Sequence, residues 1–372
     1  MTLPSGRIKT APEDFRVEEV PAYAPSGEGD HLFVRFTKTN LTTDVAVSRI
    51  AGAMRVAMRD VGIAGMKDKV AVTTQTVSFP LPREGREDFE ARLARLALDG
   101  IAIHECVRHT HKLKTGHLVA NRFTIVVRGI HATRLAEVTR ALKDAGRTGI
   151  PNAFGPQRFG RDKDNADQAR AWLSGRAKAP RDARLRRLLF SALQADLFNR
   201  VLDLRVKDGT WIHPLPGDLV KRRSSGGLYL WTEVDAEERD ELSPTGPIFG
   251  VKMRDPEGVP FELEQGVLRE SLGEGVDLSL TRPLGEGTRR SLRLWVNDLR
   301  VDACELRGEP ASIAATSGGQ EEERDLNVSF VLPKGGYATS VLGTVLALES
   351  HETVPEGSPE TSSHLPRALL TR

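Results

Sequence analysis

The sequence predicts an α+β fold with two domains, and three observations support this prediction. The 372 residues exceed what one compact core usually serves. Residues 31–142 follow the order strand, helix, strand, strand, helix, which does not match a regular doubly wound sheet. Residues 206–310 are rich in Gly, Pro and short alternating runs, which indicates a second domain of small strands and loops.

The first strands and helix have clear periodicities. In 31–37 every second residue is apolar, which predicts a half-buried strand carrying Leu32, Val34 and Phe36 on one side. A threonine cap near Thr43 then precedes a helix. Its apolar positions are Val47, Ile50, Ala51 and Met54. After Asp68 the period returns to two, which predicts another strand.

The middle of the chain continues this pattern. Residues 122–130 predict a strand, and the following helix is expected to end near Gly146. The Gly-, Pro- and Asn-rich segment 149–165 indicates a junction. A second helix is predicted from apolar residues at helical spacing: Leu185, Leu188, Leu189, Leu193, Leu197 and Val201.

The last third returns to regular structure before it ends in a polar tail. Alternating apolar residues predict a strand over 326–332, followed by a Pro-Lys-Gly-Gly turn and a short helix. Residues 351–372 are rich in Pro, Ser and Glu, a composition typical of disorder.

The overall composition excludes few function classes. A total of 53 Lys and Arg against 51 Asp and Glu gives a net charge of +2, so any nucleic-acid surface has to come from uneven placement. The chain starts without an apolar signal segment, and no apolar run approaches the roughly 20 residues that span a bilayer. We therefore expect a cytoplasmic protein without membrane contact. Cys106 and Cys304 are expected to be reduced there, with a single disulfide as the alternative.

One short stretch, GMKDKVAVTTQ (65–75), places Asp68 between Lys67 and Lys69 at the start of a strand. On its own, such a tripeptide is most often a solvated turn. The alternative is a carboxylate kept ionised for chemistry, since neighbouring ammonium groups favour the charged form. In an extended stretch, however, both lysines would point away from Asp68, so that one of them contacts a phosphate or a structural acid instead.

Six segments in order carry a family resemblance: KTAPEDFRVEE (9–19), AGMKDKVAVTTQ (64–75), NRFTIVVRG (121–129), GIPNAFGPQRFG (149–160), RLLFSALQADLFNRVL (187–202) and VSFVLPKGGYATSVL (328–342). Together they make the chain resemble a TruD-type tRNA pseudouridine synthase, from about Lys9 to Leu348. Ala120 and Gly336 depart from residues common in the family, and neither departure removes a catalytic group.

This resemblance implies a pseudouridine-synthase-type catalytic domain with a mixed or antiparallel sheet flanked by helices. It would comprise residues 1–153 and 306–350, with a smaller α+β TRUD domain inserted at 154–305. The implied activity is conversion of a uridine in tRNA, uridine 13, to pseudouridine. That isomerisation breaks the bond from ribose C1′ to uracil N1 and rejoins the base through C5, so we expect no nucleotide, metal or other cofactor.

The resemblance also assigns roles to particular residues. Asp68 would be the catalytic carboxylate, which either attacks C1′ or removes the C2′ proton. Phe123 would stack on the target base, although a strand phenylalanine is ordinarily a core residue. Asn121 would face the same pocket or support the catalytic loop. Tyr337 would line the pocket, with a core tyrosine after a tight turn as an equal alternative.

Two lysines and two acids complete the candidates. Lys9 lies where the family keeps a basic active-site residue, although a lysine near the N-terminus is usually solvated. Lys67 is expected to be a polar partner of the substrate. Glu13 and Asp14 are interpreted as structural acids at the start of a helix or turn, where negative charge is favourable.

Three basic segments, 108–117, 178–187 and 221–225, lie in both expected domains. A single charge run is usually a solvated surface, but their distribution suits an RNA held between the domains through its phosphates. The first segment tempts a metal interpretation, with His104, Cys106, His109, His111 and His117 nearby. Their spacing matches no recognised zinc pattern, and we predict no metal site there.

Other function classes have less support. The chain contains no GxxxxGK[ST], GxGxxG or HExxH motif, so ATP, NAD and zinc-protease chemistry lack their usual signals. The competing hypothesis is a tRNA-binding chaperone without catalysis. Such a protein would keep the basic clusters but would have no need of an acid at position 68.

Overall fold

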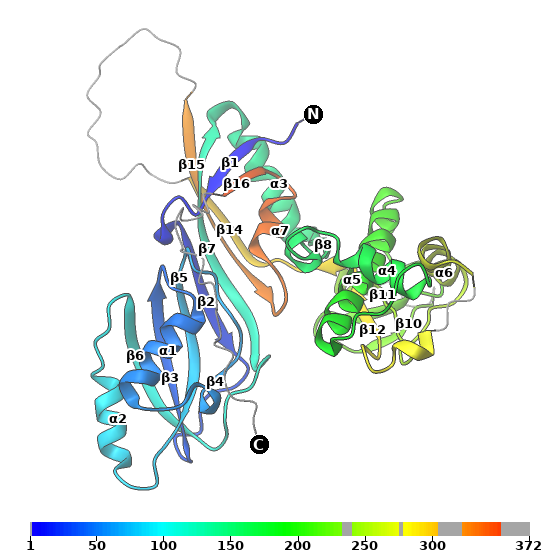
Figure 1. Cartoon of the computed structure of the whole chain (residues 1–372). Coiled ribbons are helices and arrows are strands. Elements are labelled where there is room, and N and C mark those ends of the chain that lie inside the picture. Colours follow the sequence, from blue (N-terminus) through cyan, green and yellow to red (C-terminus); the bar gives the residue numbers. More distant parts are fainter. Residues whose placement is uncertain (1, 233–239, 275–277, 304–321, 351–372) are drawn as a thin grey trace, which may run out of the picture.

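The computed structural model describes residues 2–232, 240–274, 278–303 and 322–350. Cys304, the tail 351–372 and the expected boundary at 305 lie outside this range, so the predictions made for them stay predictions. The described residues form one large mixed sheet with helices and a second, smaller group of strands and helices beside it (Figure 1). Mixed helix and strand architecture is the fold class that the sequence predicts.

The large sheet has ten strands. Its main path runs β14 (Asn297–Ala303), β15 (Glu323–Pro333), β7 (Leu118–His131), β2 (Phe15–Pro21), β5 (Val72–Pro80), β3 (His31–Thr39) and β6 (Ile101–His109). Off this path lie β1 (Ser5–Ile8), β16 (Ala347–Ser350) and β4 (Gly62–Ile63). The pairs β2–β5 and β1–β16 are parallel and the other pairs of this sheet are antiparallel, which makes the sheet mixed.

Helices α1 (Thr43–Met54) and α2 (Arg86–Ala94) cover the β3 end of the sheet. The alternation predicted in β3 is confirmed, since Leu32, Val34 and Phe36 are all buried against these helices. The cap of α1 is Thr42, whose hydroxyl accepts a hydrogen bond from the Val45 amide at 3.2 Å. This end of the sheet therefore has its own core.

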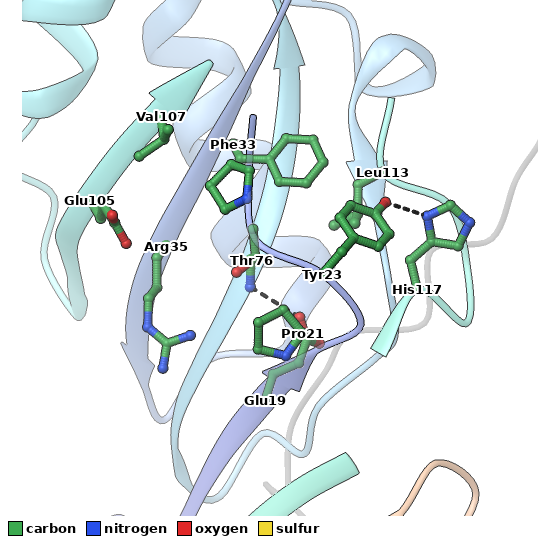
Figure 2. Close-up of a pocket in the computed structure, with 11 residues that line it drawn as sticks. Glu19, Pro21, Tyr23, Phe33, Arg35, Thr76, Glu105, Val107, Leu113 and His117 are labelled. Carbon is green, nitrogen blue, oxygen red and sulfur yellow. Dashed lines mark hydrogen bonds between the residues drawn. The ribbon is translucent and has the colours of Figure 1, made fainter. Parts of the chain in front are cut away.

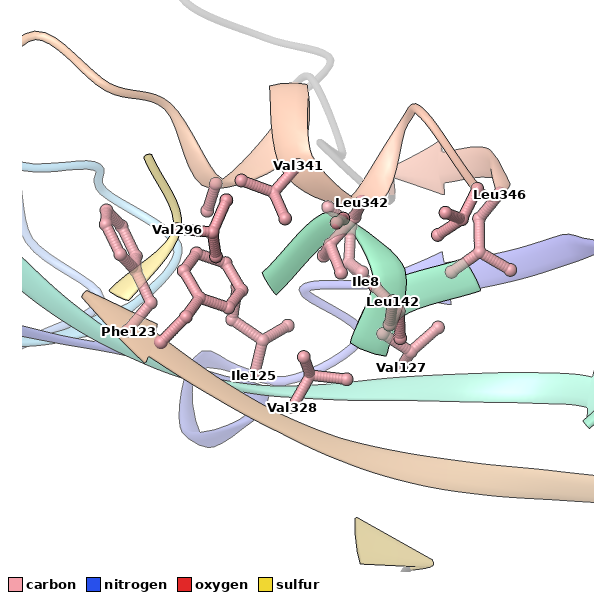
Figure 3. Close-up of a cluster of buried hydrophobic side chains, with 14 of the residues drawn as sticks. Ile8, Phe123, Ile125, Val127, Leu142, Val296, Val328, Val341, Leu342 and Leu346 are labelled. Carbon is pink, nitrogen blue, oxygen red and sulfur yellow. The ribbon is translucent and has the colours of Figure 1, made fainter. Parts of the chain in front are cut away.

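A second core lies where β7 and β15 pack against α3 (Leu135–Thr148) and α7 (Ala338–Leu342) (Figure 3). Helix α3 ends at Thr148, two residues past the Gly146 near which the sequence predicts its end. A Cβ at Gly146 would lie 2.9 Å from Leu299 on β14, so this glycine permits close packing. The helix ends before Gly149, whose φ of +75° is left-handed.

The second group contains a four-stranded sheet and three helices. Its strands are β9 (Leu219–Arg222), β10 (Leu228–Leu230), β11 (Leu242–Ile248) and β12 (Thr288–Ser291), and its helices are α4 (Asn165–Leu173), α5 (Ala183–Lys207) and α6 (Gly258–Leu272). The predicted helix is α5, and Leu189, Leu193, Leu197 and Val201 are buried in its core. Leu185 and Leu188 are exposed instead.

The segments before and after the small sheet pair with each other. Strands β8 (Ile150–Pro151) and β13 (Arg293–Leu294) form a separate antiparallel two-stranded sheet, and the small sheet lies between them in the sequence. Strand β14 pairs with β15 in the large sheet, although the sequence places it in the inserted domain. The short helices η1 (Pro12–Asp14), η2 (Met58–Asp60), η3 (Ala132–Arg134), η4 (Pro156–Phe159) and η6 (Leu278–Thr281) connect these elements. Within the described ranges, no helix is long and apolar enough to cross a membrane.

Candidate active site

A cavity of about 300 Å³ lies where β7, the loop before β5 and the turn before α7 meet. All six site residues that the sequence analysis proposes line it. They are Lys9, Lys67, Asp68, Asn121, Phe123 and Tyr337. Phe15, Val17 and Leu118 contribute an apolar wall. The cavity thus combines charged groups with aromatic rings, although its residues come from segments more than 300 positions apart.

Asp68 lies in the irregular loop 64–71 between β4 and β5. Its side chain is 56% exposed, and one carboxylate oxygen accepts a hydrogen bond from the Lys9 ammonium at 2.9 Å. The carboxylate therefore has a fixed cationic partner on one side and stays accessible from the cavity on the other. A carboxylate that reacts with a substrate needs both a cationic partner that keeps it ionised and access to the cavity.

Lys9 is the cation beside Asp68, whereas the sequence places Lys67 and Lys69 on either side of it. Lys9 is buried, and its ammonium lies 4.7 Å from the centre of the Phe15 ring. Its φ of +58° is left-handed, which is uncommon for a residue other than glycine. This backbone conformation between β1 and η1 occurs where the side chain turns inward to Asp68, and such outliers gather at functional sites.

Lys67 pairs with a structural acid. Its ammonium lies 2.8 Å from Glu19 on β2, and the two side chains are 6% and 2% exposed. The second oxygen of Glu19 accepts a hydrogen bond from the Thr76 amide, drawn in Figure 2, and the Lys67 amide donates to Thr43 at 2.9 Å. Lys67 therefore anchors the loop 64–71 to the sheet, and a direct contact with substrate stays a prediction.

Phe123 and Asn121 project from the same face of β7. Phe123 is 6% exposed and packs edge-on against Phe15 at 6.2 Å and tilted against Phe330 at 5.5 Å, so it belongs to the core as well as to the cavity wall. The Oδ1 atom of Asn121 is buried, and no partner for it lies among the described residues. A buried acceptor without a partner is costly, which makes it available to a ligand donor.

Tyr337 follows a tight turn in which Gly335 has a φ of +83°. The core alternative for this tyrosine is wrong, because 49% of it is exposed and it lies over the cavity. Gln157 and Lys334 also line the cavity and were missed. Gln157 lies in the segment GIPNAFGPQRFG, and Lys334 lies in the Pro-Lys-Gly-Gly turn. Both segments stand out in the sequence, so their motifs could have indicated these two residues.

Of the two acids before β2, Asp14 has structural contacts, as interpreted from the sequence, whereas Glu13 is exposed. Asp14 ends the short helix η1 and is buried. Its carboxylate accepts from Arg128 at 2.6 and 2.8 Å and from the Ala11 amide at 3.1 Å. These contacts fix the turn that leads from Lys9 into β2.

A smaller pocket lies behind Glu19, lined by Tyr23, Phe33 and His117 among others (Figure 2). The Tyr23 hydroxyl and His117 Nδ1 are 2.6 Å apart, and His109 and His111 contact through their Nε2 atoms at 3.1 Å. Across the described ranges, no three His, Cys, Asp or Glu side chains are arranged to hold a metal ion.

The Cys106 thiol on β6 is partly buried. Burial raises the pKa of the Cys106 thiol to about 11.

The basic segments lie in different surroundings. Lys221, Arg222 and Arg223 line a cavity of about 530 Å³ that shares residues 334–336 with the candidate site. Segment 178–187 leads into α5, where Arg184 and Arg187 are exposed. Segment 108–117 contributes the histidines beside Tyr23. One basic segment therefore lines a cavity that adjoins the candidate site.

Comparison with known proteins identifies the family. The family model for tRNA pseudouridine synthase D (TruD) matches residues 4–177 and 175–345. The chain is 42% identical over 349 residues to tRNA pseudouridine synthase D of Anaeromyxobacter sp. strain Fw109-5, covering 91% of each chain. The chain belongs to the TruD family.

One further relative supports this assignment, and a solved structure shows the extent of the fold. The tRNA pseudouridine synthase D of Thermus thermophilus is 34% identical over 365 residues, which cover 97% of this chain and 94% of the relative. A crystal structure of a TruD protein from Methanosarcina mazei superposes with a TM-score of 0.74 over 93% of this chain and 94% of that one, at 22% identity. This similarity shows that the TruD fold extends over nearly the whole chain.

Proposed function

We propose that this protein converts uridine 13 of tRNA to pseudouridine, with Asp68 as its catalytic carboxylate. Membership of the TruD family supports tRNA pseudouridylation as the activity. The observation that carries the residue assignment is the position of Asp68, which lies in one cavity with a buried lysine and three aromatic rings, Phe15, Phe123 and Tyr337.

The chemistry requires few groups. The C1′–N1 bond of the nucleotide breaks, a C1′–C5 bond forms, and the proton on C5 is exchanged for one on N1, so the overall reaction is an isomerisation. An ionised carboxylate at the sugar can attack C1′ or accept the C2′ proton. The exposed side of the Asp68 carboxylate faces the space where that sugar would lie, and Lys9 holds its other side.

The base needs a separate binding surface, because it leaves the RNA stack to react. Tyr337 is exposed over the cavity and Phe123 forms its wall, so one or both rings stack on the uracil. The unpartnered Oδ1 of Asn121 accepts a hydrogen bond from the N3–H group of the base. Uracil keeps this donor in both the substrate and the product.

We further propose that residues around the large sheet form the catalytic domain and that the small sheet with α4, α5 and α6 forms the inserted domain. The pairing of β8 with β13 supports a connection at this position. Because β14 belongs to the large sheet, the boundary at the end of the inserted domain would move from residue 305 to about residue 295.

The proposal is tested by mapping pseudouridine in tRNA from cells that lack this protein, before and after its gene is restored. We expect pseudouridine at position 13 to disappear from tRNA in its absence and to return with the wild-type gene but not with an Asp68→Asn variant. Loss at a different position would contradict the uridine 13 assignment, and an unchanged map would contradict the function.

The basic residues in the first two turns of α5 provide a second prediction. Replacing Arg184, Arg186 and Arg187 together with Gln should weaken tRNA binding and reduce the slope of log Kd against log salt by about 1 for each RNA phosphate that these side chains neutralise. The matched control replaces Arg83, Arg95 and Arg140, which are exposed and do not line the two cavities. A salt slope equal to that of the wild type would show that these three arginines only cover a helix surface.

A further inference from the structure

The loop that carries Asp68 has no regular structure of its own and depends on side chains from other elements. Thr43 of α1 accepts a hydrogen bond from the Lys67 amide, and Glu19 of β2 binds the Lys67 ammonium. Lys9 binds the Asp68 carboxylate. One further contact is made to the main chain of Asp68 itself: Lys38 Nζ donates to its carbonyl oxygen at 2.6 Å.

Lys38 is an unusual residue for its position. It lies near the end of β3 on the face that α1 covers, and it is fully buried. Its partners across the sheet, Thr73 on β5 and Ile101 on β6, carry no charge. An apolar side chain would fill this position without the cost of burying an ammonium group, so the lysine here is present at a cost to stability.

We propose that Lys38 is a positioning residue, which holds the Asp68 main chain from beneath the loop and so directs the carboxylate into the cavity. It does not line the cavity and therefore has no contact with substrate. The inference rests on the proposed function of Asp68. Because a displacement of about 1 Å at a reacting group can cost about 100-fold in rate, a single main-chain contact is sufficient for this effect.

The charge of Lys38 makes the proposal sensitive to pH. Burial lowers the pKa of Lys38 to about 8, the Asp68 carboxylate opposes this shift, and the Lys67 ammonium adds to it. Asp68 and Lys67 are themselves paired, with Lys9 and Glu19 respectively. Below pH about 8 Lys38 is an ammonium and makes a charge-assisted hydrogen bond, and above it the donor is a weaker neutral amine.

Activity and stability should then respond to pH in opposite directions. As pH rises through about 8, kcat is expected to fall because the hydrogen bond to Asp68 weakens. Over the same range and up to the ordinary lysine pKa of 10.5, the contribution of Lys38 to stability becomes more favourable, because the folded state binds fewer protons than the unfolded state. A loss of activity through general unfolding would show the reverse trend in stability.

The test measures kcat and KM of the full-length Lys38→Met variant with tRNA as substrate, and its free energy of unfolding. All are measured between pH 6.5 and 9.5, limits that lie about 1.5 units on either side of the Lys38 pKa. We expect kcat at pH 7 to fall by about 10- to 100-fold, KM to change by less than about twofold, and the decline above pH 8 to vanish. The matched control is Arg92→Met on α2, which removes a cationic side-chain contact to the main-chain carbonyl of Met54, 3.2 Å in length; Arg92 neither lines the cavity nor belongs to the three basic segments. This control should retain wild-type kinetics.

The inference is overturned if Lys38→Met keeps the wild-type kcat, if KM rises as much as kcat falls, or if the alkaline decline persists in the variant. Should Lys38→Met fail to fold, Lys38→Gln decides instead, since its shorter amide keeps a donor without the charge. We expect Lys38→Gln to show an intermediate kcat and no alkaline decline. Wild-type protein that forms no pseudouridine would instead overturn the proposed function, and with it the role of Lys38.

Discussion

Replacing Asp68 with Asn is expected to abolish pseudouridine formation while tRNA affinity stays within several-fold of wild type. The amide has nearly the size of the carboxylate but neither attacks C1′ nor accepts a proton at neutral pH. Removing a nucleophile or base of this kind lowers kcat by at least about 1,000-fold in well-studied enzymes. The measurement is single-turnover conversion of purified tRNA, with binding followed separately by filter retention.

A matched control separates the role of Asp68 from a general effect of lost charge. Asp60→Asn changes an exposed acid at the end of η2 that does not line the cavity, and it should retain full activity. Equal activity of Asp68→Asn and wild type would contradict the catalytic assignment. Full tRNA binding in a wild-type protein without any activity would favour the chaperone hypothesis.

Replacing Glu19 with Gln is expected to have the largest effect on stability. It leaves the Lys67 ammonium, only 6% exposed, without its carboxylate. Removing one member of a buried pair costs about 3–5 kcal/mol, because the remaining charge is still excluded from water. Urea denaturation of the full-length protein should show this decrease in the free energy of unfolding, and activity should fall as the Asp68 loop loses its anchor.

Two further variants test the cause of this destabilisation. Combining Glu19→Gln with Lys67→Met removes both charges and should recover most of the stability. The exposed pair Lys252–Glu286, with atoms 2.7 Å apart, provides the surface control, and Glu286→Gln should have little effect. A Glu19→Gln variant as stable as wild type would show that water reaches Lys67 and replaces the carboxylate.

Local sequence patterns predicted those helices and strands in which regularly spaced apolar residues form the buried face. The alternation in β3 and the helical spacing in α1 and α5 gave both the type of element and most of the buried residues. Strands β1, β2 and β6 were not predicted, because their burial depends on partners. In β2, for example, Glu19 is buried through its pairing with Lys67.

The candidate site was predicted as a set of residues, but the contacts among them were not. The order of six segments pointed to the family, and all six proposed residues line one cavity. The cation beside Asp68 is Lys9, which is 59 positions away, and the lysines adjacent in sequence are not the residues that bind its carboxylate. Successive residues in an extended chain point in opposite directions, so sequence neighbours rarely become contacts.

The sequence by itself determined the family, the α+β class and the identity of the proposed catalytic carboxylate, because these follow from motifs and from local periodicity. Only the tertiary structure decided which groups hold that carboxylate: Lys9 at its oxygen, and Lys38 beneath its main chain. The physical reason is that hydrogen bonds and ion pairs act over about 3 Å in space, and only the folded chain brings Lys9 and Lys38 within that distance of Asp68.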